Sequence, residues 1–226
     1  MRRLLIPVMF GLLGVGVLLW LGTWQVQRLA WKEGVLAEIE ARIAAAPVAL
    51  PANPDPERDQ YLSVRLSGTL SPETLRVLVS RKQIGAGYRL ISALDTGERR
   101  VLVDRGFVRV GENIPDAPTS EFTVTGNLNW PDDRNSSTPD NDVAGNTWFA
   151  RDIAQMAEVL DTQPVLVIAR EMSPADPGVT SLPVDTSAIP NDHLSYAITW
   201  YSLAAIWAIM TLYFLWRQRA PRPKAR

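Results

Sequence analysis

Two uncharged apolar stretches near the ends of this 226-residue chain limit its fold more than any other feature. They run from Leu4 to Leu21 and from Tyr196 to Trp216, and neither contains Asp, Glu, Lys or Arg. About 20 such residues suffice for a helix to cross the hydrocarbon core of a bilayer. Tryptophans lie near the ends of both stretches, as is usual at membrane interfaces. The sequence therefore predicts two transmembrane helices, over residues 4–24 and 193–216, with the lipid bilayer as one partner.

Basic residues outside the two helices indicate their orientation. Residues 1–3 and 217–226 hold seven of the 23 basic residues and none of the 24 acidic ones. The segment between the helices thus holds 24 acidic and 16 basic residues, a formal charge of −8. By the positive-inside rule, we expect both termini in the cytoplasm, the second as a basic tail, and the middle segment across the membrane. The acidic middle segment also argues against nucleic acid as a partner.

The first apolar stretch is expected to remain as an uncleaved anchor. It is long for a signal peptide, and Trp24-Gln25-Val26-Gln27-Arg28 follows it instead of a small-residue cleavage site. The N-terminus also lacks an Arg- and Ser-rich transit segment, which favours a bacterial protein. We therefore expect a two-pass protein of the bacterial inner (cytoplasmic) membrane, with a periplasmic central domain.

The segment between the helices predicts one α+β domain with a mostly antiparallel sheet. Residues 25–60 are expected to form a helical extension and a proline-rich connector, and residues 171–192 a second proline-rich connector. The domain is expected over residues 61–170, where short alternating or buried apolar runs recur. The predicted strands are Tyr61 to Leu70, Leu75 to Val79, Tyr88 to Leu94, Val101 to Val110, Phe122 to Leu128 and Val165 to Ala169. An amphipathic helix is predicted from Asp152, as its N-cap, to Leu160.

His193 is the only histidine of the chain, and there is no cysteine. Its imidazole is therefore the only strong nitrogen or sulfur donor for a transition metal or a haem iron. The absence of cysteine also excludes a disulfide framework and a thiolate copper or zinc site. Such metal chemistry, if the chain performs it, has to use the start of the second transmembrane helix.

Stripes of small residues suggest how the two helices pack. The first helix carries Gly11, Gly14, Leu18 and Gly22 on one face, and the second carries His193, Ala197, Trp200, Ala204 and Ala208. Small residues allow helices to approach closely in a membrane. We therefore expect an antiparallel pair in which His193 lies level with Trp24, Gln25 and Arg28.

The residues around this level predict a pocket at the membrane interface. Trp24, Arg28, Trp31 and Lys32 share one helical face. Such a pocket suits a haem, with the imidazole on the iron, a cation near the propionates and indoles against the macrocycle. The alternative is that these residues only anchor the helices at the interface.

Motifs beside both helices resemble those of the surfeit locus protein one family of cytochrome c oxidase biogenesis factors. One is Leu21-Gly22-Thr23-Trp24-Gln25-Val26-Gln27-Arg28-Leu29-Ala30-Trp31-Lys32, and another is Asn191-Asp192-His193-Leu194-Ser195-Tyr196-Ala197-Ile198-Thr199-Trp200-Tyr201. Between them, Val103-Asp104-Arg105-Gly106-Phe107-Val108 resembles the family's central strand, and Trp148-Phe149-Ala150-Arg151-Asp152 a further motif. The resemblance covers essentially the whole chain.

This resemblance implies a protein that is not an enzyme. It implies a chaperone that receives haem a from haem a synthase, binds it transiently and helps to insert it into subunit I of cytochrome c oxidase. The ligand position of the haem iron corresponds to His193, and the other candidate haem-binding residues are Trp24, Gln25, Arg28 and Trp200.

Two other functions remain open from the sequence. In the first, the sheet domain is a haem-independent scaffold that stabilises subunit I during assembly, and damage around Arg105-Gly106-Phe107 would impair it. In the second, the protein is a membrane-tethered enzyme, for which the sequence offers little support.

Overall fold

The computed structural model describes residues 2–81, 85–118, 120–187 and 189–219. The chain forms two compact units. One unit, Met1–Glu38 with Ser187–Arg226, contains the helix pair, and the other, Ile39–Thr186, contains the sheet domain.

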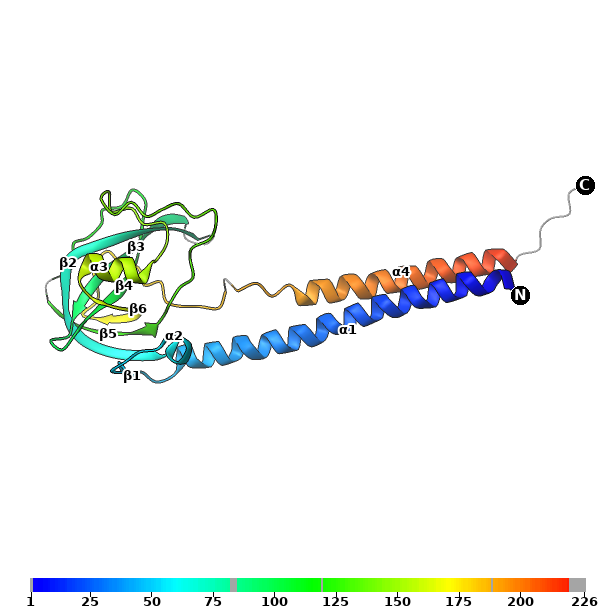
Figure 1. The fold of residues 1–226 in the computed structure, drawn as a ribbon, viewed down its shortest axis with the longest axis horizontal. Coiled ribbons are helices and arrows are strands. Elements are labelled where there is room, and N and C mark those ends of the chain that lie inside the picture. The colour runs from blue at the N-terminus through cyan, green and yellow to red at the C-terminus, as the bar shows by residue number, and fades with distance from the viewer. Residues whose placement is uncertain (1, 82–84, 119, 188, 220–226) are drawn as a thin grey trace, which may run out of the picture. The chain divides into compact units, whose positions relative to one another are not determined.

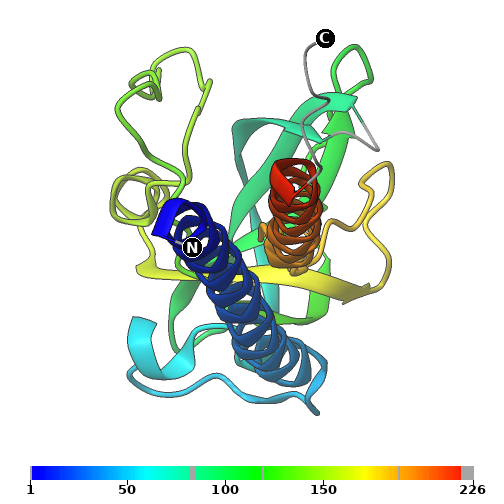
Figure 2. The ribbon, with the colours of Figure 1, turned by 90° about the vertical axis from the view of Figure 1, so that its right-hand side faces the viewer.

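The helix pair consists of α1 (Arg2–Ala44) and α4 (His193–Arg219). Leu5–Ala44 and His193–Gln218 are each long and apolar enough to cross a membrane. The two helices lie side by side and run antiparallel (Figures 1 and 2). This arrangement confirms the predicted pairing.

Glycines on α1 lie directly against side chains of α4. A Cβ atom added to Gly22 would lie only 2.8 Å from a ring carbon of Tyr201, and one added to Gly11 or Gly14 would clash with Thr211 or Trp207. On α4, Ala197 and Ala204 are 2% and 3% exposed. The predicted small-residue stripes are therefore the surfaces through which the helices pack.

The sheet domain contains six strands and two short helices. The strands are β1 (Val48–Ala49), β2 (Ser63–Arg81), β3 (Gly85–Asp95), β4 (Arg100–Arg109), β5 (Glu121–Leu128) and β6 (Gln163–Ser173). The helices are α2 (Pro56–Asp59) and α3 (Ile153–Leu160), and Asp152 caps α3 as predicted, accepting the N–H of Gln155.

The sheet closes on itself. Its order is β1-β2-β3-β4-β6-β5, and β2 also pairs with β5, so that β2, β3, β4, β6 and β5 form a ring. The β1–β2 and β4–β6 pairings are parallel, and the remaining ones are antiparallel. The mostly antiparallel sheet was thus predicted, whereas its closure was not.

Two apolar clusters stabilise the ring. One takes residues from all five strands of the ring, among them Val64, Leu94, Val103, Val124 and Val167, and fills its interior. The other packs the strands against α3 and the fully buried Trp148.

Both predicted connectors contain more structure than expected. β1 and α2 lie in the first connector, and β6 continues to Ser173 at the start of the second. The bonded pair Phe107–Thr180 then joins the second connector to β4. The sheet domain consequently extends beyond the predicted residues 61–170, to Ile39–Thr186.

Candidate functional site

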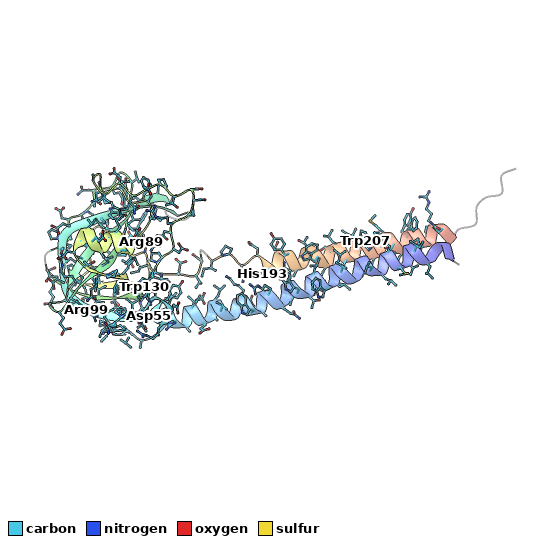
Figure 3. The ribbon with its side chains drawn as sticks, viewed as in Figure 1. Asp55, Arg89, Arg99, Trp130, His193 and Trp207 are labelled. Carbon is cyan, nitrogen blue, oxygen red and sulfur yellow. The ribbon has the colours of Figure 1, made fainter. Side chains whose placement is uncertain are left out.

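His193 is the first residue of α4, and Figure 3 shows it at that end of the helix. The N–H of Tyr196 donates to the carbonyl oxygen of Asp192, at 3.2 Å, which forms the first turn. The helix start therefore fixes the backbone position from which the imidazole extends.

Gln25 on α1 holds the imidazole. The Nδ1 atom of His193 lies 2.8 Å from the Oε1 atom of Gln25. Gln25 is only 8% exposed, although it lies in a helix with mostly exposed polar residues. An amide oxygen accepts, so Nδ1 carries the proton and donates, and the lone pair of the neutral ring is on Nε2. A metal-binding histidine is commonly held in this way, with its second nitrogen donating to an oxygen.

Cationic side chains lie on the same face of α1 as Gln25. Arg28 follows Gln25 by three residues and Lys32 follows Arg28 by four, so the three residues form a row along the helix. The guanidinium of Arg28 stacks 3.9 Å from the ring centroid of Trp31. The row places positive charge about one and two turns after Gln25 along α1, in the C-terminal direction of the helix.

The structure does not bring all the predicted residues together. Gly22 faces α4, and Trp24, two residues later, is about 200° further around the helix axis. Trp24 and Trp31 are 48% and 52% exposed. Gln25 thus contacts His193, whereas Trp24 points away from α4. Trp200 is half-buried, two turns along α4 from His193.

Asn191 is a further polar residue at this site. Its Oδ1 atom is buried and accepts no hydrogen bond from any described residue. The sequence patterns assign Asn191 no role beyond its place in the motif that precedes the second apolar stretch. Its position two residues before His193 is the one signal that could have identified it.

The site contains one strong ligand and no metal cluster. Within the described ranges, no group of three or more His, Cys, Asp or Glu side chains could hold a metal ion. A bare transition metal needs several protein donors, whereas a haem iron already has four porphyrin nitrogens and needs only axial ligands. The donor set around His193 therefore fits a haem better than a free ion.

The central Arg-Gly-aromatic motif is a structural feature of the sheet domain. Arg105 and Phe107 are 2% and 4% exposed. The guanidinium of Arg105 donates to both carboxylate oxygens of Asp176, at 2.7 and 3.0 Å. Phe107 exchanges backbone hydrogen bonds of 2.7 and 2.9 Å with Thr180. The motif thus attaches the second connector to β4 and offers little surface to a partner.

A cavity of about 260 Å³ in the sheet domain contains a second ion pair. Arg151 donates to both carboxylate oxygens of Asp133, at 2.6 and 2.9 Å. Burial acts to raise the pKa of Asp133, but the hydrogen bonds and charge of Arg151 outweigh it, so the pKa is lowered. Burial likewise acts to lower the pKa of Arg151, and Asp133 raises it overall. The two charges satisfy each other, which indicates a structural role.

Comparisons with known proteins agree over most of the chain. The SURF1 family model matches residues 12–205. A SURF1-like protein of Monosiga brevicollis is 36% identical, with 90% of this chain and 88% of that protein covered. Surfeit locus protein 1 of Homo sapiens is 30% identical, covering 82% of this chain and 69% of the human protein. A SURF1-like protein of Drosophila melanogaster is also 30% identical, with coverage of 87% and 71%.

Proposed function

The chain belongs to the SURF1 family of cytochrome oxidase assembly factors, and we propose that it binds haem a through His193 and assists its insertion into subunit I of cytochrome c oxidase. Haem a is the cargo of this protein, and no catalytic step is required of the chain. In this proposal haem a synthase supplies the cargo and subunit I receives it.

The contact between His193 and Gln25 carries the proposal. It sets the imidazole to donate from Nδ1 and to present the Nε2 lone pair, the form in which histidine binds haem iron. An accepting oxygen at Nδ1 also orients the ring and makes Nε2 a better electron donor. A haem iron with a single strong protein ligand is released more easily than one with two, which suits a transient carrier.

The charged residues near His193 support the same cargo. A haem has two propionates, and Arg28 and Lys32 extend along α1 from the level of Gln25. Guanidinium and ammonium groups bind carboxylates well at a membrane interface. We assign Arg28 and Lys32 to the propionates, and Trp200 to the wall of the site on α4.

The proposed location is the bacterial inner membrane. Both termini would lie in the cytoplasm and the sheet domain in the periplasm, because the seven basic residues at the ends of the chain, within residues 1–3 and 217–226, have no acidic counterparts there. His193 would then lie at the periplasmic end of its helix.

An optical spectrum tests the binding proposal. The protein is produced in cells that synthesise haem a and then purified. We expect haem absorbance with the wild type, its loss with His193→Ala, and its retention with Asp192→Ala, which changes an exposed neighbour. Pigment that is unchanged in His193→Ala contradicts the proposed ligand.

Gln25 provides a second and subtler test. Gln25→Leu removes the acceptor of Nδ1, and we expect haem affinity to fall by about ten-fold or more. Gln27→Leu makes the same change at an exposed position two residues away and should have little effect. If His193→Ala binds no haem yet still supports a fully haem-loaded oxidase, the haem-independent scaffold is the correct function.

A further inference from the structure

One flank of the helix pair carries an apolar groove with a volume of about 580 Å³. Both helices line it, with Gly14, Val17 and Leu18 on α1 and Leu203, Trp207 and Met210 on α4. Gly14 contributes no side chain, and the indole of Trp207 packs directly against it. The Phe10 and Trp207 rings pack with their centroids 5.5 Å apart and form its far end (Figure 3 labels Trp207).

The groove lies on the flank of the helix pair that carries the cations. Phe10 and Arg28 are 18 residues apart, and so are Gly14 and Lys32, which is five full turns in each case. Each pair therefore lies on one line along α1. A ligand that contacts Gln25 can thus reach the cations in one direction and the groove in the other.

The distance from His193 and Gln25 to the groove, measured along the helices, suits a ligand with an apolar tail of moderate length. Leu203 follows His193 by ten residues, or about 15 Å of helix, and Leu18 precedes Gln25 by seven, or about 10 Å. The near end of the groove thus begins two to three turns from the imidazole. An extended farnesyl chain spans roughly three helical turns.

We propose that this groove binds the isoprenoid chain of haem a. The inference rests on the proposed function, because it places the macrocycle at His193. The propionates and the hydroxyethylfarnesyl chain leave opposite sides of the haem a macrocycle. Arg28 and Lys32 on one side of Gln25, and an apolar groove on the other, match this distribution of charge along one flank.

The opposite flank lacks these features and provides a control. Its groove, of about 320 Å³, is lined by Leu12, Val15 and Leu212 among others. Leu12 and Thr23 are 11 residues apart and so lie on one face of α1. The hydroxyl groups of Thr23 and Tyr201, 3.2 Å apart, form a polar contact between this groove and the level of His193.

Binding of three haems to the purified full-length protein in lipid nanodiscs tests the inference. Haem b has no isoprenoid chain, haem o has the chain without the formyl group, and haem a has both. We expect haem o and haem a to bind about five-fold or more tightly than haem b. The gain is modest because lipid is as apolar as the groove, and only close packing favours the bound chain.

Matched tryptophan variants locate the bound isoprenoid chain. Leu203→Trp fills the groove, and we expect it to lower the affinities for haem o and haem a to that for haem b, with haem b unaffected. Leu212→Trp makes the same change in the opposite groove and should retain the preference. Val17→Trp fills the same groove from α1 and should repeat the effect of Leu203→Trp even if one variant disturbs the helix pair.

The possible outcomes separate this inference from the function on which it rests. If haem b binds in a way that depends on His193 and haem o binds no more tightly, then lipid chains fill the groove. That result overturns the groove inference and leaves the proposed function standing. A preference that survives both Leu203→Trp and Val17→Trp also overturns it. If the wild type binds none of the three haems, the proposed function fails together with the inference.

Discussion

Buried charged residues in the sheet domain are held by partners distant in sequence. Arg89 pairs with Asp104, and its guanidinium also donates to the carbonyl oxygen of Leu182, at 2.6 Å. Arg105 pairs with Asp176, and both side chains are less than 5% exposed. Charges buried to this degree are tolerated only when they are fully paired, and losing one partner destabilises strongly. Both arginines hold the second connector against the ring of strands.

Asp133 makes the stability of the sheet domain depend on pH. Its pKa in the folded protein is below the ordinary value of 3.8, so its pairing with Arg151 stabilises the fold above that pH. The stabilisation is lost as the pH falls through the lowered pKa. We expect Asp133→Asn to cost about 1 kcal/mol at neutral pH, a value reduced for the partial exposure of the carboxylate. The difference between the wild type and the variant should shrink as the pH falls below 3.8.

Thermal unfolding of the full-length protein between pH 7 and pH 3 measures this difference. Asp140→Asn is the control, because Asp140 makes an exposed ion pair with Arg134 and should contribute almost nothing. An acid dependence that is the same in Asp133→Asn and the wild type would assign the effect to other carboxylates, such as Asp59, whose pKa its hydrogen bond to Arg58 also lowers.

At the level of elements, local patterns predicted most of the strands but not how they join. Alternating apolar residues identified stretches in β2, β3, β4 and β5, and the amphipathic pattern identified α3. Two predicted strands proved to be one, because β2 continues past Ser71 and Pro72 with an irregularity between Leu70 and Thr74. Closure of the ring depends on β2–β5 pairing between residues about 60 positions apart, which no local pattern reveals.

The candidate site was predictable to a similar extent. Composition alone singled out His193, and the small-residue stripes gave the level on α1 that it faces. They did not give the rotation of α1 at that level. That rotation points the side chain of Gln25 toward His193 and the side chain of Trp24 away from α4, because successive side chains of a helix differ in direction by about 100°.

Gly106 tests the attachment of the second connector to β4. Its φ angle is +133°, and an added Cβ would clash with the carbonyl oxygen of Thr180. We expect Gly106→Ala to lower the free energy of unfolding by about 3 kcal/mol, from backbone strain and displacement of the connector together. Chemical denaturation of the full-length protein measures the loss.

Gly111→Ala separates the two contributions. Gly111 also has a positive φ angle, of +91°, but an added Cβ there meets nothing within 4 Å. It should therefore cost only the backbone strain, about 1 kcal/mol. Equal losses in the two variants would mean that the contact between Gly106 and Thr180 contributes nothing.

At the scale of the whole molecule, charge is divided between the middle and the ends of the chain. The overall formal charge of −1 conceals −8 over residues 4–216 and +7 over residues 1–3 and 217–226. A membrane that is negative inside and bears anionic cytoplasmic lipids favours the basic ends on the cytoplasmic side. Under the proposed function, this orientation would decide on which side of the membrane His193 meets haem a.

The absence of cysteine from the chain makes this orientation directly measurable. A single cysteine is introduced either at Ser136, in an exposed loop of the sheet domain, or at Gln218, at the exposed end of α4. In intact bacterial spheroplasts, a membrane-impermeant maleimide should label Ser136→Cys and should label Gln218→Cys only after lysis. The unmodified chain gives the background. Labelling of Gln218→Cys before lysis, with Ser136→Cys protected, would reverse the proposed orientation and place His193 at the cytoplasmic surface, because Gln218 and His193 lie at opposite ends of one helix that is long and apolar enough to cross a membrane.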